Sequence, residues 1–403
     1  MKNLFIVIIV LFWGCKSAEK ETGPTTIDGV VEIKVDVEDA RPLAMSEFFS
    51  NVTYLPLKTP NSRPIGYIFK IMPQGDKIVL YDRSSQSVWV FSDSGEYITE
   101  VRIPYGRGAG EIEHISDVYF DKEFNVHAMG AFKYVEYDMN GELLNETQFD
   151  QFVQAIVYSN RDSMYYANFE GSPNQRIDEK FRDFQLYAFN KDGEIENGYL
   201  PLSKNKMGIG YTIPNRFPLY ENKLFFFRHL DDTVYELSAD TVKAAFRFNF
   251  GEQTLTDEVF ENRYSYGSEM WEWSDFWDAE VRPYGYITYL SFVELTHEFI
   301  FSGVGSGNGS HFMILYNRET GEVDVGEEKF INNIDYGPSP FLYSSSDEYL
   351  YSYVNAGDLL RRLNSVYQNN REIYGSDKMK ELRRLASDMR EESNPVLMRL
   401  TFK

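Results

Sequence analysis

VWVFSDSGEYITEV (Val88–Val101) is the clearest hairpin in this chain of 403 residues. Apolar and polar residues alternate on both sides of its Asp-Ser-Gly-Glu segment, which predicts two β-strands joined by a tight turn. Gly95 suits the turn because glycine adopts a positive φ without a steric penalty. Four more stretches follow the pattern: YVEYDMNGELLNET from Tyr134, LYAFNKDGEIENGYL from Leu186, VYELSADTVKAAFRF from Val234 and MILYNRETGEVDVG from Met313. The chain therefore repeats a strand-turn-strand unit, and we predict an all-β fold.

The repeat has a nearly constant length. The spacings between turns are 46, 52, 46 and 82 residues, counted between Gly95, Gly141, Gly193, Ala239 and Gly321. Four-stranded blades of a β-propeller recur about every 40 to 50 residues. The last spacing is longer because residues of about 252–283 lack the strand pattern. Without that segment, the chain between 52 and 356 holds about six repeats, so we predict a six-bladed β-propeller.

Two segments have helical patterns instead. Aromatic residues at helix-like intervals predict a helical insertion at about 252–283, before blade five. Residues of about 357–392 predict C-terminal helices, with an apolar stripe of Met379, Leu382, Leu385, Ala386 and Met389. Asn394 and Pro395 end the helical pattern, and residues of about 396–402 alternate as a closing strand. Since VTYLPLKT (Val52–Thr59) also lacks a local partner, we predict one blade built from both termini.

The N-terminus is typical of an exported protein. Lys2 precedes an apolar run that is too short for a bilayer-spanning helix of about 20 residues, so residues 1–14 are predicted to be a signal peptide. Gly14 before Cys15, the only cysteine, resembles the lipobox of bacterial lipoproteins, which predicts lipidation of Cys15. Phe12 and Trp13 depart from that motif, and an ordinary secretory peptide is the alternative. A single cysteine excludes an intrachain disulfide.

The mature chain is predicted to have two parts. Residues 15–31 are polar and charged, and we predict that they form a lipidated, flexible tether. Residues 32–403 are predicted to form the propeller. The predicted location is the bacterial cell envelope, as an outer membrane lipoprotein that faces the periplasm or the cell surface. The net charge of −22 at pH 7 argues against nucleic acid as a partner and leaves the N-terminal lipid as the only predicted membrane contact.

These features together resemble a known family, the six-bladed β-propeller lipoproteins of Bacteroides-type bacteria, with repeats like those of NHL propellers. The resemblance rests on VTYLPLKT, IGYIFKIMPQGDKIVLYD, the DSGE turn, GRGAGE and the final EESNPVLMRLTFK. Ala239 in the fourth turn and the long insertion depart from the family pattern. The resemblance implies a fold and an envelope location. It implies no catalytic residues, because most members have no known activity.

A glycine-rich stretch is the first candidate site. YGRGAGEIEHISDVYF (Tyr105–Phe120) is followed by an alternating strand pattern rather than a helix, which argues against a dinucleotide-binding loop. Its glycines suit a crossover between two blades where backbones approach closely. The alternative is that Arg107, Glu111 and His114 line the mouth of the central channel, where propellers commonly bind ligands.

The tryptophans of the insertion are the second candidate site. Trp271, Trp273 and Trp277 hold three of the four indole rings left after removal of the signal. One interpretation is that these rings attach the insertion to a face of the propeller. The other is an aromatic platform for a sugar ring or a partner protein.

Catalytic motifs are missing from the sequence. The five histidines are scattered without metal-ligand spacing, and there is no G-x-S-x-G elbow. We therefore expect a binding or scaffolding module for a glycan, peptide or membrane-protein partner, and no enzyme. The alternative is a metal-assisted hydrolase or lyase, of a calcium-dependent type, at the central channel, because carboxylates from different blades can meet there without a sequence motif. The sequence leaves the cofactor open, and Ca²⁺ is the one candidate that this alternative suggests.

Overall fold

The structure is a computed structural model. It describes residues 24–403, apart from 131, 150–152, 170–176, 207–212, 214, 268–272, 341 and 347. The predicted signal peptide and Cys15 lie outside the described residues. Within them, no helix is both long and apolar enough to cross a bilayer.

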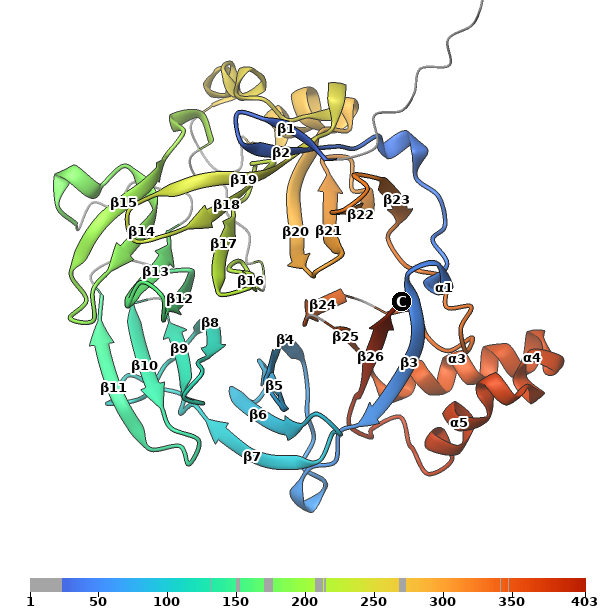
Figure 1. Ribbon diagram of the computed structural model, residues 1–403. Coiled ribbons are helices and arrows are strands. Elements are labelled where there is room, and N and C mark those ends of the chain that lie inside the picture. The colour runs from blue at the N-terminus through green and yellow to red at the C-terminus, as the bar shows by residue number, and fades with distance from the viewer. Residues whose placement is uncertain are drawn as a thin grey trace, which may run out of the picture.

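Across the described residues, hydrogen-bonded strands form six sheets that surround a common centre (Figure 1). From the centre outwards, the first sheet has β4 (Ile68–Gln74), β5 (Lys77–Asp82), β6 (Ser87–Ser92) and β7 (Tyr97–Arg102). The second has β8 (Ile115–Phe120), β9 (Val126–Gly130), β10 (Lys133–Tyr137) and β11 (Leu143–Gln148). The third has β12 (Ala155–Ser159), β13 (Met164–Asn168), β14 (Phe184–Phe189) and β15 (Ile195–Pro201).

The other three sheets complete the ring. The fourth has β16 (Leu219–Tyr220), β17 (Lys223–Phe227), β18 (Thr233–Leu237), β19 (Val242–Asn249), β2 (Val30–Lys34) and β1 (Thr25–Ile27). The fifth has β20 (Ile287–Leu295), β21 (Phe299–Ser306), β22 (His311–Asn317) and β23 (Val323–Glu327). The sixth has β24 (Leu342–Ser345), β25 (Tyr349–Val354), β26 (Val396–Phe402) and β3 (Phe49–Pro56). The arrangement is that of a β-propeller.

The five predicted hairpins are confirmed. Each is an antiparallel pair of the third and fourth strands of its sheet: β6–β7, β10–β11, β14–β15, β18–β19 and β22–β23. The four turn glycines have φ between 74° and 85°, a region that favours glycine. Apolar clusters fill the spaces between neighbouring sheets, as between the first and second sheets around Val90 and Val118. Because each sheet is covered on both faces, its middle strands are apolar on both faces, as in KLFFF.

The predicted tether is wrong from Thr25 onwards. Residues 25–27 pair with 30–32 through a two-residue turn at Asp28 and Gly29, both at positive φ, and Asp-Gly is a strong hairpin signal. The second strand of this hairpin, β2, runs parallel to β19 and places Ile33 in the core. Hydrophobic burial therefore holds the end of the predicted tether against the fourth sheet.

The sixth sheet joins the two ends of the chain, as predicted. β26 pairs antiparallel with β3 from Val396↔Pro56 to Phe402↔Phe49. The predicted helices are α3 (Ala356–Asn369), α4 (Arg371–Gly375) and α5 (Asp377–Ala386), and they pack outside this sheet (Figure 1). Met379, Leu382 and Ala386 of the predicted stripe are buried in the same cluster as β26. A short helix, α1 (Met45–Phe48), leads into β3.

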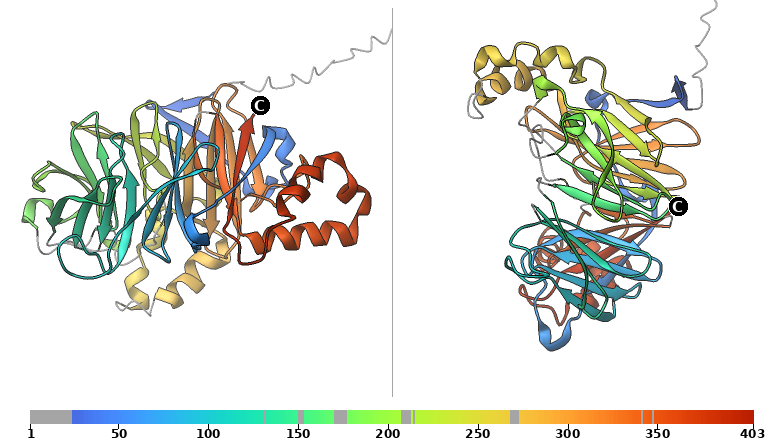
Figure 2. Two further views of the ribbon diagram at one scale, coloured as in Figure 1. Left: turned by 90° about the horizontal axis from the view of Figure 1, so that it is seen from below. Right: turned by 90° about the vertical axis from the view of Figure 1, so that its left-hand side faces the viewer.

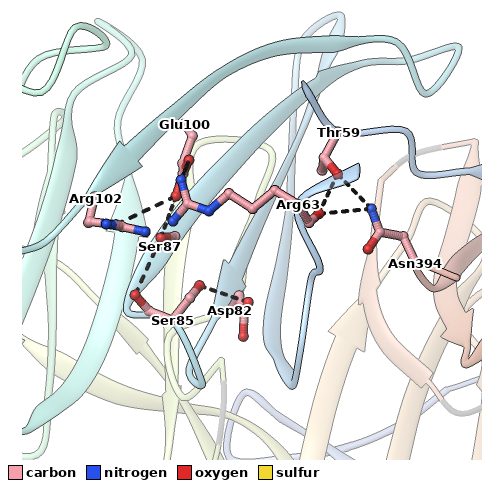
Figure 3. Close-up of polar contacts among 8 residues, drawn as sticks. All are labelled: Thr59, Arg63, Asp82, Ser85, Ser87, Glu100, Arg102 and Asn394. Carbon is pink, nitrogen blue, oxygen red and sulfur yellow. Dashed lines mark hydrogen bonds and ion pairs between the residues drawn. The ribbon is translucent and has the colours of Figure 1, made fainter. Parts of the chain in front are cut away.

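Asn394 ties the closing segment to the crossover that leads into the first sheet (Figure 3). Its Nδ2 donates to Thr59 Oγ1 at 2.8 Å and to the Arg63 carbonyl at 3.3 Å, and its Oδ1 accepts from the Ile65 backbone N–H at 2.8 Å. The guanidinium of Arg63 in turn pairs with Glu100 on β7. The crossover between the sixth and first sheets is therefore bonded to the segment before β26 on one side and to β7 on the other.

The insertion is helical, as predicted, but it consists of several short helices. Its described part contains 3₁₀-helices at Asp257–Phe260, Arg263–Tyr266 and Arg282–Tyr284. Between the last two lie the α-helix α2 (Trp273–Phe276) and a π-helical turn at Trp277–Val281. Gly267, at φ 124°, follows the second 3₁₀-helix and ends it, so the helical conformation does not continue past Tyr266. Figure 2 shows the insertion projecting from one face of the ring.

Candidate ligand-binding site

A cavity of about 180 Å³ lies at the centre of the ring. All six sheets line it, each with its innermost strand or the residues beside that strand. Its wall includes Gln74, Lys122 and Asn160, which lie where β4, β8 and β12 end. The insertion precedes β20 and therefore lies where the innermost strands begin. The cavity residues at these strand ends and the insertion thus belong to opposite faces of the ring.

A buried ion pair joins the first two sheets beside this cavity. Lys70 Nζ on β4 lies 2.9 Å from Asp117 Oδ1 on β8, and each side chain is 7% exposed. Asp117 also accepts from the backbone N–H of Val118 at 2.9 Å and of Ile156, on β12, at 3.3 Å. Because the carboxylate is bonded to three neighbouring innermost strands, it fixes their relative positions. Buried charges require such partners.

Glu294 on β20 holds the opposite side of the cavity together. Its Oε1 accepts from Asn215 Nδ2 at 2.7 Å, and its Oε2 accepts from the Ser345 N–H at 2.9 Å and the Ser345 hydroxyl at 2.8 Å. These bonds connect the fifth sheet with the sixth sheet and with the segment that leads into the fourth. Complete burial raises the pKa of Glu294 to about 7, although the bonds from Ser345 and Asn215 act in the opposite direction.

We expect this carboxyl group to make stability fall between about pH 4.5 and pH 7. The folded protein keeps the Glu294 proton to about pH 7, whereas the unfolded chain loses it near the usual pKa of 4.5. Folded protein therefore binds more protons in this window, and the free energy of unfolding declines as pH rises, by about 3 kcal/mol at 1.36 kcal/mol per unit. Glu294→Gln keeps the shape and one of the two acceptor oxygens but has no titrating proton, and we expect it to abolish this decline.

Urea unfolding at about pH 5 and about pH 8 measures the difference for wild type and variant. Glu142→Gln, at an exposed turn, is the matched control and is expected to follow wild type. Equal pH dependence in wild type and Glu294→Gln would show that the group is already ionised in the folded protein.

A histidine and two carboxylates meet at the edge of the cavity. One ligand atom each from Asp121, His127 and Glu136 lie within 4.8 Å of one another. His127 on β9 and Glu136 on β10 are cross-strand partners, and Asp121 directly follows β8 and lines the cavity. His127 Nε2 lies 2.8 Å from Asp121 Oδ2, and the ring stacks on Tyr119 with centroids 4.0 Å apart. Within the described residues, this is the one such group of potential metal ligands.

The glycine-rich loop packs on the outer strands of the second sheet. Lys133 Nζ, on β10, donates to the Gly108 carbonyl at 2.7 Å, and Glu146, on β11, accepts from the Gly110 N–H at 2.5 Å. Gly110 has φ 72°, and a Cβ there would lie 2.9 Å from the Tyr137 hydroxyl. These contacts agree with a crossover between neighbouring sheets.

The three residues predicted to line the channel mouth are not among those that line the central cavity. Arg107 is 85% exposed and pairs with Glu113 at 2.7 Å. Glu111 accepts from the Gly108 N–H at 2.8 Å within the loop, and His114 is exposed. The structure therefore does not bring Arg107, Glu111 and His114 together with the charged groups of the cavity.

The tryptophans of the insertion make internal contacts. Trp273 is half-buried beneath the guanidinium of Arg263, which lies 3.2 Å from the ring centroid. Trp277, also half-buried, donates from Nε1 to the Gly307 carbonyl at 3.3 Å, next to β21. Trp271 lies outside the described residues. Trp277 thus attaches the insertion to the fifth sheet and Trp273 packs within the insertion, which favours the first of the two interpretations.

The sequence matches a known family from residue 28 to residue 401, the family described as Domain of unknown function (DUF4934). The chain belongs to this family. A comparison with curated protein sequences found no match.

One solved structure supports the fold. An exported protein of Bacteroides fragilis aligns with a TM-score of 0.71 at 18% identity, covering 93% of this chain and 99% of that one. A DUF4221-family protein of Bacteroides vulgatus aligns with a TM-score of 0.49 at 12% identity, covering 88% and 97%. At 18% identity, the similarity to the first structure supports a common fold and says nothing of a common ligand.

Proposed function

We propose that this protein is an exported, six-bladed β-propeller, anchored to the outer membrane by a lipid on Cys15, that binds the terminal sugar of a glycan in its central cavity. The six sheets are the proposed blades. The observation that carries the binding role is a central cavity lined by all six sheets, with polar side chains on several of them. The export and anchor rest on the N-terminal sequence, and the exported Bacteroides fragilis protein with the same fold supports the export.

The size of the cavity limits what it can hold. Sites for drug-sized ligands enclose about 300–1,000 Å³. A cavity of about 180 Å³ is smaller and admits one sugar unit or a similarly small group. A longer glycan would therefore insert only its end, and the rest of the glycan would extend from the face of the ring at which Gln74, Lys122 and Asn160 lie.

The chemistry of the wall favours a neutral, polar ligand. Its cationic groups, Lys70 and Lys122, are balanced by anionic groups in and beside the wall, so neither sign of charge dominates. Asn160, Asn215 and Ser345 offer further hydrogen bonds, and the rings of Tyr119, Tyr158 and Phe217 offer apolar surface. Sugars present hydroxyl groups on their rim and C–H groups on their faces, and this combination matches such a wall.

Ligand binding is expected to disappear when the cavity is filled. Val157 on β12 lines the cavity. A glycan that binds wild type raises its melting temperature and gives a saturable heat signal in calorimetry, and Val157→Phe is expected to abolish both effects. Val323→Phe places the same enlargement on the outermost strand of the fifth sheet, and that variant is expected to bind as wild type does. The panel contains neutral monosaccharides, oligosaccharides that end in them, and free amino acids.

Trp273→Ala separates the two candidate sites. Retention of binding in Trp273→Ala together with its loss in Val157→Phe supports the central cavity. Loss in Trp273→Ala alone would place the ligand on the insertion and contradict the proposal. Binding of amino acids but of no sugar would contradict the ligand class while keeping the cavity.

A further inference from the structure

We propose that Asp121, His127 and Glu136 form a binding site for a transition metal ion, with Zn²⁺ as the best match, at the edge of the central cavity. The site does not depend on which ligand the cavity takes. It would supply the metal that the alternative hypothesis of metal-assisted chemistry at the channel requires, with a different ion from the Ca²⁺ expected there.

The geometry of the three donors is close to what zinc needs. Zinc bonds to nitrogen and carboxylate oxygen measure about 2.0–2.2 Å, so two ligand atoms on one tetrahedral ion stand roughly 3.3–3.6 Å apart. The donor atoms of Asp121, His127 and Glu136 already lie within 4.8 Å of one another. Side-chain movements of about 1 Å would therefore complete three coordination bonds, with no change in the strands that carry them.

The kind of donor argues for zinc over calcium. Ca²⁺ takes oxygen ligands almost exclusively, whereas imidazole suits zinc and other transition metals. His127 supplies this imidazole, and 3% exposure of its side chain keeps it away from competing water. The Asp121 side chain is 9% exposed; its Oδ1 accepts from the Asn125 backbone N–H at 2.7 Å and its Oδ2 lies 2.8 Å from His127 Nε2, so the carboxylate is held beside the imidazole.

Neighbouring groups can orient the ligands. His127 Nδ1 lies 2.5 Å from the Tyr134 hydroxyl, so that Nδ1–H can donate to Tyr134 while Nε2 binds the metal, an arrangement common to metal-bound histidines. Asn125 Nδ2 now donates to both carboxylates, at 3.3 Å from Asp121 Oδ2 and 3.2 Å from Glu136 Oε1. A rotation of this amide would direct its oxygen to the same point and add a fourth ligand.

The site also has an access route. Asp121 and Tyr119 line the central cavity, so an ion can enter from it and a ligand in the cavity can approach the ion. Catalytic zinc sites have three protein ligands and keep one position open. If Asn125 does not rotate, the fourth position stays open in the same way.

The test is calorimetric titration of the full-length protein with Zn²⁺, Mn²⁺ and Ca²⁺ after treatment with a chelator. Cys15→Ser is present in every variant, so that no thiol competes for zinc. We expect one Zn²⁺ per chain, tighter than Mn²⁺ and Ca²⁺, and at least about 100-fold weaker Zn²⁺ binding in His127→Gln and in Glu136→Gln. Co²⁺ in place of Zn²⁺ is expected to give the visible absorption bands of a tetrahedral site, and these bands disappear in both variants.

Control variants test whether Zn²⁺ binds elsewhere on the protein and whether a loss of binding results from unfolding. His114→Gln removes an exposed histidine before the same sheet, and Asp138→Asn removes a carboxylate from the turn after β10; both are expected to bind Zn²⁺ as wild type does. Metal-free Glu136→Gln must melt within a few degrees of metal-free wild type. Failure of wild type to bind Zn²⁺, or equal binding in wild type and Glu136→Gln, would overturn the proposal and leave His127 as a structural residue.

Discussion

Removal of the closing strand β26, by deletion of residues 396–403, is expected to abolish cooperative folding. Val396, Leu397, Met398 and Leu400 are fully buried, and full burial of such side chains is worth about 1.5–3 kcal/mol each. The deletion also leaves β3 and β25 without the partner that lies between them, so two strand edges become exposed. Together these losses match or exceed the total stability of most domains, about 5–15 kcal/mol. Size-exclusion chromatography and thermal unfolding followed by circular dichroism measure the outcome.

A point substitution in β26 tests the same contribution with a smaller expected loss of stability, and an N-terminal deletion is the control. Leu400→Ala is expected to cost about 2–5 kcal/mol, because it opens a cavity in a packed cluster. Deletion up to Asp28, which removes β1 at the outer edge of the fourth sheet, is expected to leave a folded protein. A monomeric, cooperatively melting chain after deletion of 396–403 would show that the sixth sheet does not need to be closed by the C-terminus.

The repeated hairpins could be predicted because each is a local feature. A turn such as that at Gly95 and the strands on both sides of it lie within 14 residues, so sequence alone specifies their pairing. The pairing of β3 with β26 spans most of the chain, yet it could be predicted because each strand had no neighbour to pair with. A short Asp28-Gly29 signal at the edge of a polar segment was missed, and with it the strand that covers β19.

The central site could not be predicted in the same way. Lys70, Asp117 and Glu294 are single charges within apolar strands, in YIFKIMP, ISDVYF and SFVEL. Each such charge is a signal that an innermost strand carries a buried polar group. Which charges meet depends on closure of the ring, which brings together residues that lie 47 positions apart in the Lys70–Asp117 pair. The glycine-rich loop resembled a ligand site more strongly in sequence, but its glycines allow the close backbone approach of a crossover between two sheets.

The buried pair of Lys70 and Asp117 is expected to be the most sensitive point of the cavity wall. Asp117→Asn preserves the shape and a carbonyl acceptor but leaves the Lys70 ammonium buried without a counter-charge. Removing one partner of a buried ion pair costs about 3–5 kcal/mol. We expect that loss in the free energy of unfolding by urea, together with loss of ligand binding, because the three innermost strands bonded to Asp117 lose their common anchor.

A second ion pair, at the surface of the same hairpin, tests whether the loss of stability in Asp117→Asn comes from burial or from charge alone. Lys77 and Asp76 lie 2.7 Å apart between β4 and β5, but Asp76 is 81% exposed, so Asp76→Asn is expected to change stability by less than about 1 kcal/mol. Adding Lys70→Met to Asp117→Asn removes the unpaired charge and is expected to recover part of the lost stability. If Asp117→Asn costs no more than Asp76→Asn, water reaches Lys70 through the cavity, and the pair serves the ligand rather than the fold.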